Sequence, residues 1–163
     1  MVNSIIFLDI DGVLNTANYL KRQKIESGKA TNKLWDPTAC KHISMLCEHY
    51  EAGIVITSSW RHEYDIEQLQ EFFGSNNISP RFIKDVTDSY APQQDENNYC
   101  RGHEVKYWLQ QNSNQATSYV IIDDEARFLE VQQDHLVRVD KEKGFSTKEA
   151  VTKASNILEK KFN

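Results

Sequence analysis

The sequence has few cysteines and no long apolar run, and both absences exclude whole classes of protein. Its three cysteines, among 163 residues, form no Cys-x-x-Cys pair and have no histidine at zinc-finger spacing. A disulfide scaffold and a structural zinc site are therefore not expected, and reduced thiols fit a reducing compartment. No apolar stretch approaches the length that crosses a membrane. The first residues also lack the basic region and cleavage site of a signal peptide, so we expect a cytoplasmic protein.

The charge balance is mildly acidic and evenly spread. A formal net charge of -5 argues against strong non-specific attraction to nucleic acid, although a local basic patch can coexist with it. The chain has no tandem repeat, long charge block or low-complexity segment. Its length suits one sizeable core and is too short for two ordinary domains. We therefore expect a single domain over residues 1–163 with no membrane partner.

The most informative segment is an apolar run, residues 5–8, that leads into two acidic residues and a glycine. Asp9 and Asp11 are two positions apart, so on an extended backbone both carboxylates point the same way and need a cation or a shared proton. Gly12 permits a sharp exit from the strand. A plain turn is one alternative. A calcium loop is another, but it requires a closing glutamate, and no acidic residue follows at that distance. We interpret the pair as part of a metal site.

Apolar periodicity predicts that helices and strands alternate along the rest of the chain. Asp36 is a typical N-cap and Pro37 suits the first position of a helix. We expect a flap or small insert over 15–35, with a short helix around Tyr19, and a loop over 84–99. The other predicted elements are a helix over 37–51, a strand over 54–56, a helix over 66–73, a weak strand over 81–83, a helix over 102–111, strands over 119–122 and 136–139, and a helix that a capping box at 146–149 opens and that runs through 158.

This alternation predicts an α/β fold, a Rossmann-like three-layer α/β/α sandwich whose sheet is mainly parallel. The carboxyl ends of the strands in such a sheet line one crevice. Polar residues follow three of the predicted strands and are expected to meet in that crevice. They are Asp9, Asp11, Ser58, Asp123 and Asp124.

Two segments carry a resemblance to a known family. Residues 7–14 (Phe-Leu-Asp-Ile-Asp-Gly-Val-Leu) resemble the first motif of the haloacid dehalogenase (HAD) superfamily. Residues 58–61 (Ser-Ser-Trp-Arg) resemble the corresponding segment in the HAD domains of Swiss-Army-knife RNA repair proteins. The resemblance implies a phosphatase that uses Mg²⁺ and an aspartyl-phosphate intermediate, with Asp9 as nucleophile and Asp11 as general acid and base. Superfamily members that cleave carbon–halogen bonds lack the second aspartate, so a phosphorylated substrate, small or macromolecular, is expected.

The resemblance also implies a ligand set for the metal ion. Mg²⁺ would take the Asp9 carboxylate, the Asp11 backbone carbonyl and Asp124, with Asp123 nearby to orient a ligand or water. Carboxylates in a turn are often structural, and this alternative applies to the Asp123-Asp124 pair. Their position after an apolar run favours a functional role.

The second and third superfamily motifs each have two candidate residues here. Ser58 is our choice for the hydroxyl that contacts the phosphoryl group and Thr57 is the alternate, while either hydroxyl could instead cap a helix. The third motif is usually a lysine. Here Arg101 occupies that place and can bind a phosphoryl group with two hydrogen bonds, with Lys106 as the alternative one turn further on.

Residues beyond the second strand are candidates for substrate contact. Ser59 and Lys106 could bind the substrate, and Trp60 and Arg61 could stack on it and clamp it. Packing and ion pairing are the structural alternative for Trp60 and Arg61. A nucleotide or polynucleotide end phosphatase is the runner-up function, and a non-catalytic HAD-like binding module is the rival from another class.

Access to the site is expected to be open. The intervals that carry cap domains in the superfamily have too few periodic apolar residues here for a separate core. We expect an essentially capless site, covered at most by the flap over 19–29 and by the loop over 88–99. A local basic rim is expected from Lys21, Arg22, Lys24 and Arg61.

Overall fold

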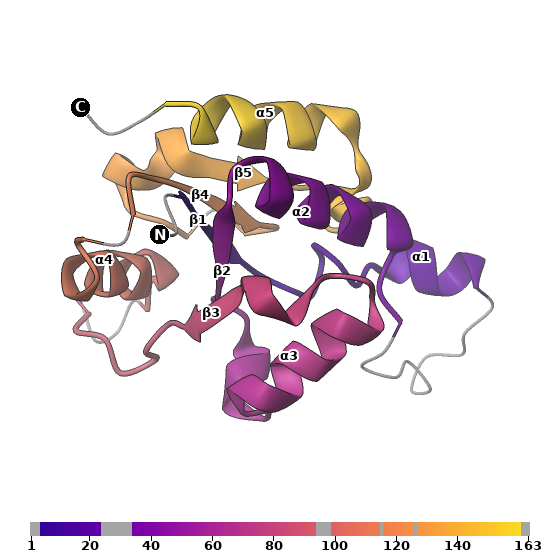
Figure 1. Ribbon diagram of the computed structural model, residues 1–163, viewed down its shortest axis with the longest axis horizontal. Helices are drawn as coiled ribbons and strands as arrows, with labels where there is room; N and C mark the ends of the chain where they lie inside the picture. Colours follow the sequence, from indigo (N-terminus) through magenta and orange to yellow (C-terminus); the bar gives the residue numbers. More distant parts are fainter. Residues whose placement is uncertain (1–3, 24–33, 94–98, 115, 126, 161–163) are drawn as a thin grey trace.

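A five-stranded parallel sheet forms the centre of the computed structural model, which describes residues 4–23, 34–93, 99–114, 116–125 and 127–160 (Figure 1). The strand order is β3-β2-β1-β4-β5. Every pairing in this sheet is parallel, where a mainly parallel sheet was predicted. The strands are β1 (Ser4–Leu8), β2 (Ala52–Ile56), β3 (Ile83–Val86), β4 (Ser118–Asp123) and β5 (Leu136–Arg138).

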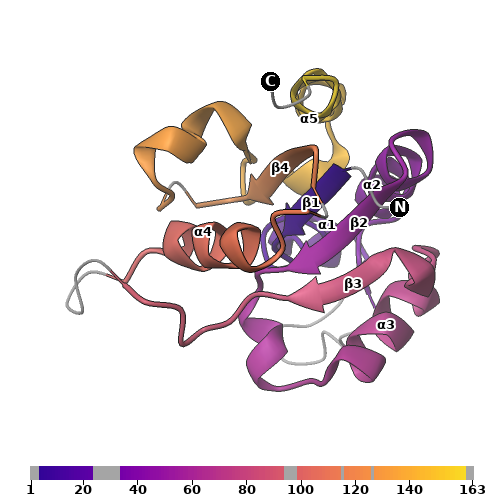
Figure 2. The same ribbon diagram turned by 60° about the vertical axis from the view of Figure 1, so that its left-hand side comes forward.

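Helices cover both faces of the sheet, as Figure 2 shows for α4 on one side and for α2, α3 and α5 on the other. Alternate residues of β1 reach the two faces: Ile6 packs in the core beneath α2, α3 and α5, and Phe7 packs beneath α4. This confirms the predicted Rossmann-like α/β/α sandwich. The helices are α1 (Ala17–Arg22), α2 (Pro37–His49), α3 (Ile66–Ser75), α4 (Arg101–Gln111) and α5 (Lys148–Leu158).

Side-chain caps fix where two of the helices begin. The Asp36 carboxylate accepts a hydrogen bond from the Thr38 amide at 2.9 Å, which confirms the predicted start of α2. The start of α5 differs by one residue from the predicted capping box. Thr147 caps α5, because Ser146 belongs to a 3₁₀ turn and donates its hydroxyl to the Lys143 carbonyl instead.

The predicted strand over 81–83 is displaced. Pro80–Phe82 forms a 3₁₀ turn, and β3 begins at Ile83 and continues into residues that were predicted as loop. Lys84 in this strand is exposed. Because β3 is an edge strand with one neighbour, polar residues are tolerated in it and the apolar pattern that marks a buried strand is missing.

The two intervals that could hold a cap contain little regular structure among the described residues. Between β1 and α2 the described chain forms α1 and a turn, and residues 24–33 of the predicted flap lie outside the described residues. Between β3 and α4, residues 87–93 and 99–100 form no helix or strand, and 94–98 lie outside the description. No helix within the described ranges is long and apolar enough to span a membrane.

Candidate active site

The carboxyl ends of the three central strands bring polar residues to one level. Leu8 of β1 pairs with Ile56 of β2 and with Ile122 of β4, so the residues that follow them lie side by side. The Asp9 amide donates to the Ile122 carbonyl, and the Thr57 amide donates to the Leu8 carbonyl, both at 3.0 Å. The register therefore places Asp9 between Thr57 and Asp123.

Three carboxylates form a tight cluster at this edge. Asp9, Asp123 and Asp124 each offer an oxygen, and these oxygens all lie within 4.8 Å of one another. Asp9 and Asp123 are buried and Asp124 is half-buried. Burial raises the pKa of Asp9, and burial together with the charge of Asp9 raises the pKa of Asp123 to about 7, although Arg101 acts against both shifts. The cluster is thus a place where a cation is favourable.

Arg101, the first residue of α4, contacts this cluster directly. Its Nη1 lies 2.7 Å from Asp123 Oδ2 and 3.4 Å from Asp9 Oδ2. Burial lowers the pKa of the Arg101 guanidinium, but the charges of Asp9 and Asp123 outweigh burial and raise it above its usual value. Lys106 is exposed and lies about 140° around the helix from Arg101, at 100° per residue. The geometry therefore brings Arg101, and not Lys106, to the acidic cluster.

A tight turn after β1 carries Asp11. Gly12 has a φ of +75°, and a Cβ on it would lie 2.5 Å from Asp124 Oδ2, so glycine is required both by the backbone and by the approach of Asp124. The Asp11 side chain is exposed. Its Oδ2 accepts a hydrogen bond from Trp60 Nε1 at 2.9 Å, and its Oδ1 accepts one from Asn15 Nδ2 at 3.4 Å.

The three hydroxyls after β2 have different environments. Ser58 Oγ accepts a hydrogen bond from the Trp60 amide and caps a 3₁₀ turn, η1 (Ser59–His62), which is the structural alternative considered for it. Thr57 is buried, and its Oγ1 has no hydrogen-bond partner among the described residues. Ser59 is exposed and lines the crevice beside Asp9. A buried hydroxyl without a partner is costly, so Thr57 Oγ1 has a hydrogen-bonding capacity that the described residues leave unused.

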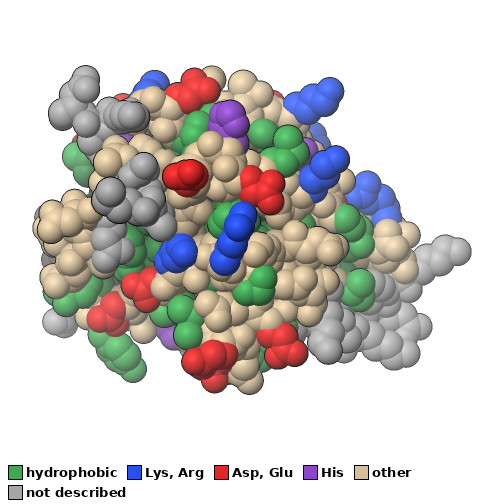
Figure 3. Space-filling view, in the orientation of Figure 1, with side chains coloured by type: hydrophobic (Ala, Val, Ile, Leu, Met, Phe, Trp, Pro, Cys, Tyr) green, Lys and Arg blue, Asp and Glu red, His purple; other side chains and the backbone are tan. Residues whose placement is uncertain are grey.

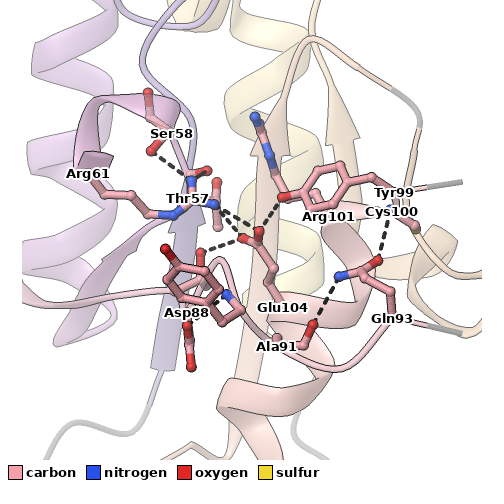
Figure 4. Close-up of polar contacts among 12 residues, drawn as sticks. Thr57, Ser58, Arg61, Asp88, Ala91, Gln93, Tyr99, Cys100, Arg101 and Glu104 are labelled. Carbon is pink, nitrogen blue, oxygen red and sulfur yellow. Dashed lines mark hydrogen bonds and ion pairs between the residues drawn. The ribbon is translucent and has the colours of Figure 1, made fainter. Parts of the chain in front are cut away.

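Arg61 is buried, which corrects its expected place in an exposed basic rim. Its side chain is 4% exposed, and its Nη2 donates to both carboxylate oxygens of Glu104, each at 2.8 Å (Figure 4). Its Nη1 donates to the backbone carbonyls of Thr57 and Ser58. An arginine in this position supports the loop that carries the hydroxyls.

Glu104 is the partner that the sequence reasoning missed. This fully buried carboxylate of α4 also accepts hydrogen bonds from the hydroxyls of Thr87 and Tyr99, at the two ends of the β3–α4 connection, so it joins that connection and the segment after β2 to α4. One indication was present in the sequence. Glu104 lies in the helix predicted over 102–111 and follows Arg101, the candidate for the third motif, by three positions, which is the spacing of side chains on one helix face.

Two residues of the predicted rim lie on α1. Lys21 and Arg22 are exposed, and Arg22 Nη2 lies 3.8 Å from Asp36 Oδ2. Lys24 lies outside the described residues. On the face shown in Figure 3, several basic side chains lie near one another along the upper right edge, and those near the centre lie beside acidic ones.

Asp9 and Asp124 of the acidic cluster line an open crevice of about 440 Å³. Lys141 and Glu142, from the loop after β5, also line it and were not found from the sequence, because no motif marks them. The candidate site residues and their neighbours that line the crevice are Asp9, Asp11, Asn15, Ser59, Arg101 and Asp124.

Comparison with known proteins agrees with this geometry. A family model described as the HAD domain in Swiss Army Knife RNA repair proteins matches residues 5–150. The chain belongs to this family. No curated protein and no solved structure matches it. The matched residues of this HAD domain include β1 except for Ser4, the other four strands and the acidic cluster, and the family supports a HAD-type hydrolase.

The first prediction concerns Glu104. In Glu104→Ala the Arg61 guanidinium stays buried without its partner, so we expect a loss of about 3–5 kcal/mol in the free energy of unfolding, measured by urea denaturation. Glu71→Gln, at an exposed position of α3, is the control and should change stability by less than about 0.5 kcal/mol. A Glu104→Ala protein as stable as the control would show that the buried ion pair does not hold these loops.

Proposed function

We propose that this HAD domain is a Mg²⁺-dependent phosphatase that hydrolyses a phosphate monoester through an aspartyl-phosphate on Asp9. The observation that carries the proposal is the cluster of Asp9, Asp123 and Asp124 beside Arg101 in an open crevice. Buried carboxylates of this number repel one another and any phosphoryl group unless a cation joins them.

The donor set of the cluster fits Mg²⁺. Hard carboxylate oxygens are the ligands that this ion prefers, and it retains positions for water and substrate oxygens. Asp9 and Asp124, with the Asp11 backbone carbonyl, would hold the ion, and Asp123 would orient a ligand. When bound, Mg²⁺ supplies positive charge that balances the carboxylates and the phosphoryl oxygens.

Asp9 and Asp11 divide the chemistry between them. An Asp9 carboxylate oxygen attacks phosphorus and forms the acyl-phosphate bond, while the bond from phosphorus to the leaving oxygen breaks. Asp11 gives its proton to that leaving oxygen. It then takes a proton from a water molecule that attacks the same phosphorus, which releases inorganic phosphate and restores the Asp9 carboxylate.

Arg101 and Thr57 would bind the phosphoryl group by donating hydrogen bonds to its oxygens. Arg101 already contacts Asp9 and has hydrogen-bond donors for phosphoryl oxygens. Thr57 Oγ1 is the preferred donor for a phosphoryl oxygen because it is level with Asp9 and has no other partner in the described structure. Ser58, our choice from the sequence, accepts the Trp60 amide hydrogen bond that caps η1, and its O–H can still donate, so Ser58 is the alternative donor.

Two features favour a macromolecular end as the substrate over a small metabolite. The crevice is open, and the described residues form no folded cap above it. The matched family is named for RNA repair proteins, so a nucleotide or polynucleotide end phosphatase is the second candidate function.

The rival function, a non-catalytic binding module, is disfavoured because both Asp9 and Asp11 are present. Hydrolysis of an aryl phosphate that requires Mg²⁺ and stops with EDTA would exclude that rival.

Substitution of the nucleophile tests the chemistry. Asp9→Asn preserves the shape of the side chain but removes the attacking carboxylate, so turnover should fall at least about a thousandfold in a steady-state assay with an aryl phosphate. Asp134→Asn, at an exposed position of the 3₁₀ turn Glu130–His135 and outside the residues that line the crevice, is the control and should keep wild-type activity. Activity of Asp9→Asn within tenfold of wild type contradicts the mechanism.

Substitution of a ligand tests the metal assignment. Asp124→Ala removes one anionic ligand, so the Mg²⁺ concentration that gives half-maximal activity should rise at least about tenfold. Calorimetric titration of the protein with Mg²⁺ checks the same loss without substrate. Asp123→Asn is the comparison variant. If Asp124→Ala leaves the titration unchanged and Asp123→Asn shifts it, the ligand is Asp123.

A further inference from the structure

Asp11 is an exposed carboxylate for which the proposed function requires a fixed orientation. A general acid works only when its proton lies within hydrogen-bond reach of the leaving oxygen, and a free surface side chain spends little time in one such geometry. The structure supplies a restraint. The indole Nε1 of Trp60 donates to Asp11 Oδ2 at 2.9 Å.

Trp60 is itself held firmly. Its half-buried ring packs at centroid distances of 5.8 Å on Trp35, 5.7 Å on Tyr64 and 6.1 Å on Phe72. Its backbone amide donates to Ser58 Oγ, and the next residue, Arg61, is anchored by Glu104. The indole N–H therefore projects from a rigid aromatic cluster and a buried ion pair.

Packing alone does not account for the direction of this N–H. Trp35 belongs to the same cluster, yet its Nε1 is buried and has no partner among the described residues. The cluster thus accommodates an indole without using its N–H. Trp60 differs because its N–H is directed at the carboxylate that follows the nucleophile by two residues.

The bond is compatible with both protonation states of Asp11. An indole N–H donates and cannot accept, so Oδ2 must present a lone pair to it whether the carboxyl is ionised or protonated. Oδ1, whose hydrogen bond from Asn15 is longer, at 3.4 Å, can then carry the proton. The restraint does not have to break when the proton is transferred.

We propose that Trp60 is a positioning residue that orients the Asp11 carboxyl group toward the leaving oxygen. This assignment replaces stacking on the substrate as the role of Trp60. It rests on the proposed function in one respect only, that Asp11 is the acid which protonates the leaving group.

A series of leaving groups tests the proposal in a way that a general folding defect cannot imitate. The alkoxide of an alkyl phosphate is a poor leaving group and needs protonation. The phenolate of an activated aryl phosphate, such as a nitrophenyl phosphate, needs little. Trp60→Phe keeps a ring in the cluster and removes the N–H. We expect kcat/KM for an alkyl phosphate to fall at least about tenfold, with kcat/KM for the aryl phosphate within about threefold of wild type.

A matched control removes a different indole N–H from the same cluster. Trp35→Phe should leave the ratio of the two kcat/KM values at its wild-type level. In an Asp11→Asn background, Trp60→Phe should cause no further loss on the alkyl phosphate, because the two residues act as one unit. Equal losses on both substrates in Trp60→Phe, or a full additional loss in the double variant, would overturn the proposal.

A measurement without substrate separates this inference from the proposed function. The chain has three tryptophans, so the labelled protein gives three indole N–H signals in a nuclear magnetic resonance spectrum. Asp11→Ala should shift the Trp60 signal upfield and speed its hydrogen exchange. The Trp108 signal, whose N–H bonds to Asp85 Oδ2 at 2.7 Å, is the internal reference and should not move.

An unchanged Trp60 signal in Asp11→Ala would overturn the positioning role whatever the activity of the protein. If Asp11→Ala shifts the Trp60 signal but the wild-type protein hydrolyses no phosphate ester, the contact is supported and the proposed function is contradicted. The two ideas therefore fail on different observations.

Discussion

Concentrated negative charge at the carboxyl edge of the sheet is the constraint on which the rest of the structure depends. Parallel pairing of β1 with β4 places Asp9 beside Asp123, and the turn at Gly12 leaves room for Asp124. Burial makes this arrangement unfavourable for ionised carboxylates, as the raised pKa values of Asp9 and Asp123 indicate. Arg101 offsets part of that cost, and a divalent cation would offset more.

The loops around this edge are held by groups that need not touch the substrate. Glu104 joins the loops after β2 and β3 to α4 through one buried carboxylate, and Arg61 extends that support to the backbone of the second motif. Trp60, the neighbour of Arg61 in the chain, in turn donates a hydrogen bond to the Asp11 carboxylate. In the proposed function, Trp60 and Arg61, for which the sequence offered both a substrate clamp and a structural role, support the candidate catalytic groups, in line with the general need for preorganised side chains in active sites.

Sequence patterns predicted the parts of the molecule that have strong local causes. The apolar run before Asp9, the Asp36 cap and the alternation of helices and strands predicted the sandwich, since burial and capping act over a few residues. The edge strand β3 was misplaced because an edge tolerates polar residues. Arg61 and Glu104 are 43 positions apart, so no local pattern could pair them, and the contact of Trp60 with Asp11 spans 49 positions. Long-range polar contacts of this kind are set by the whole fold.

The central claim is that Asp9 becomes covalently phosphorylated, and acid quenching followed by mass spectrometry tests it most directly. The protein would be mixed with Mg²⁺ and excess substrate, quenched within one turnover, and digested. The account predicts a phosphoryl group on the peptide that contains Asp9, with more of it retained in Asp11→Asn because hydrolysis of the intermediate is slowed. Turnover without any phosphorylated peptide, or with the phosphoryl group on another residue, would contradict the account.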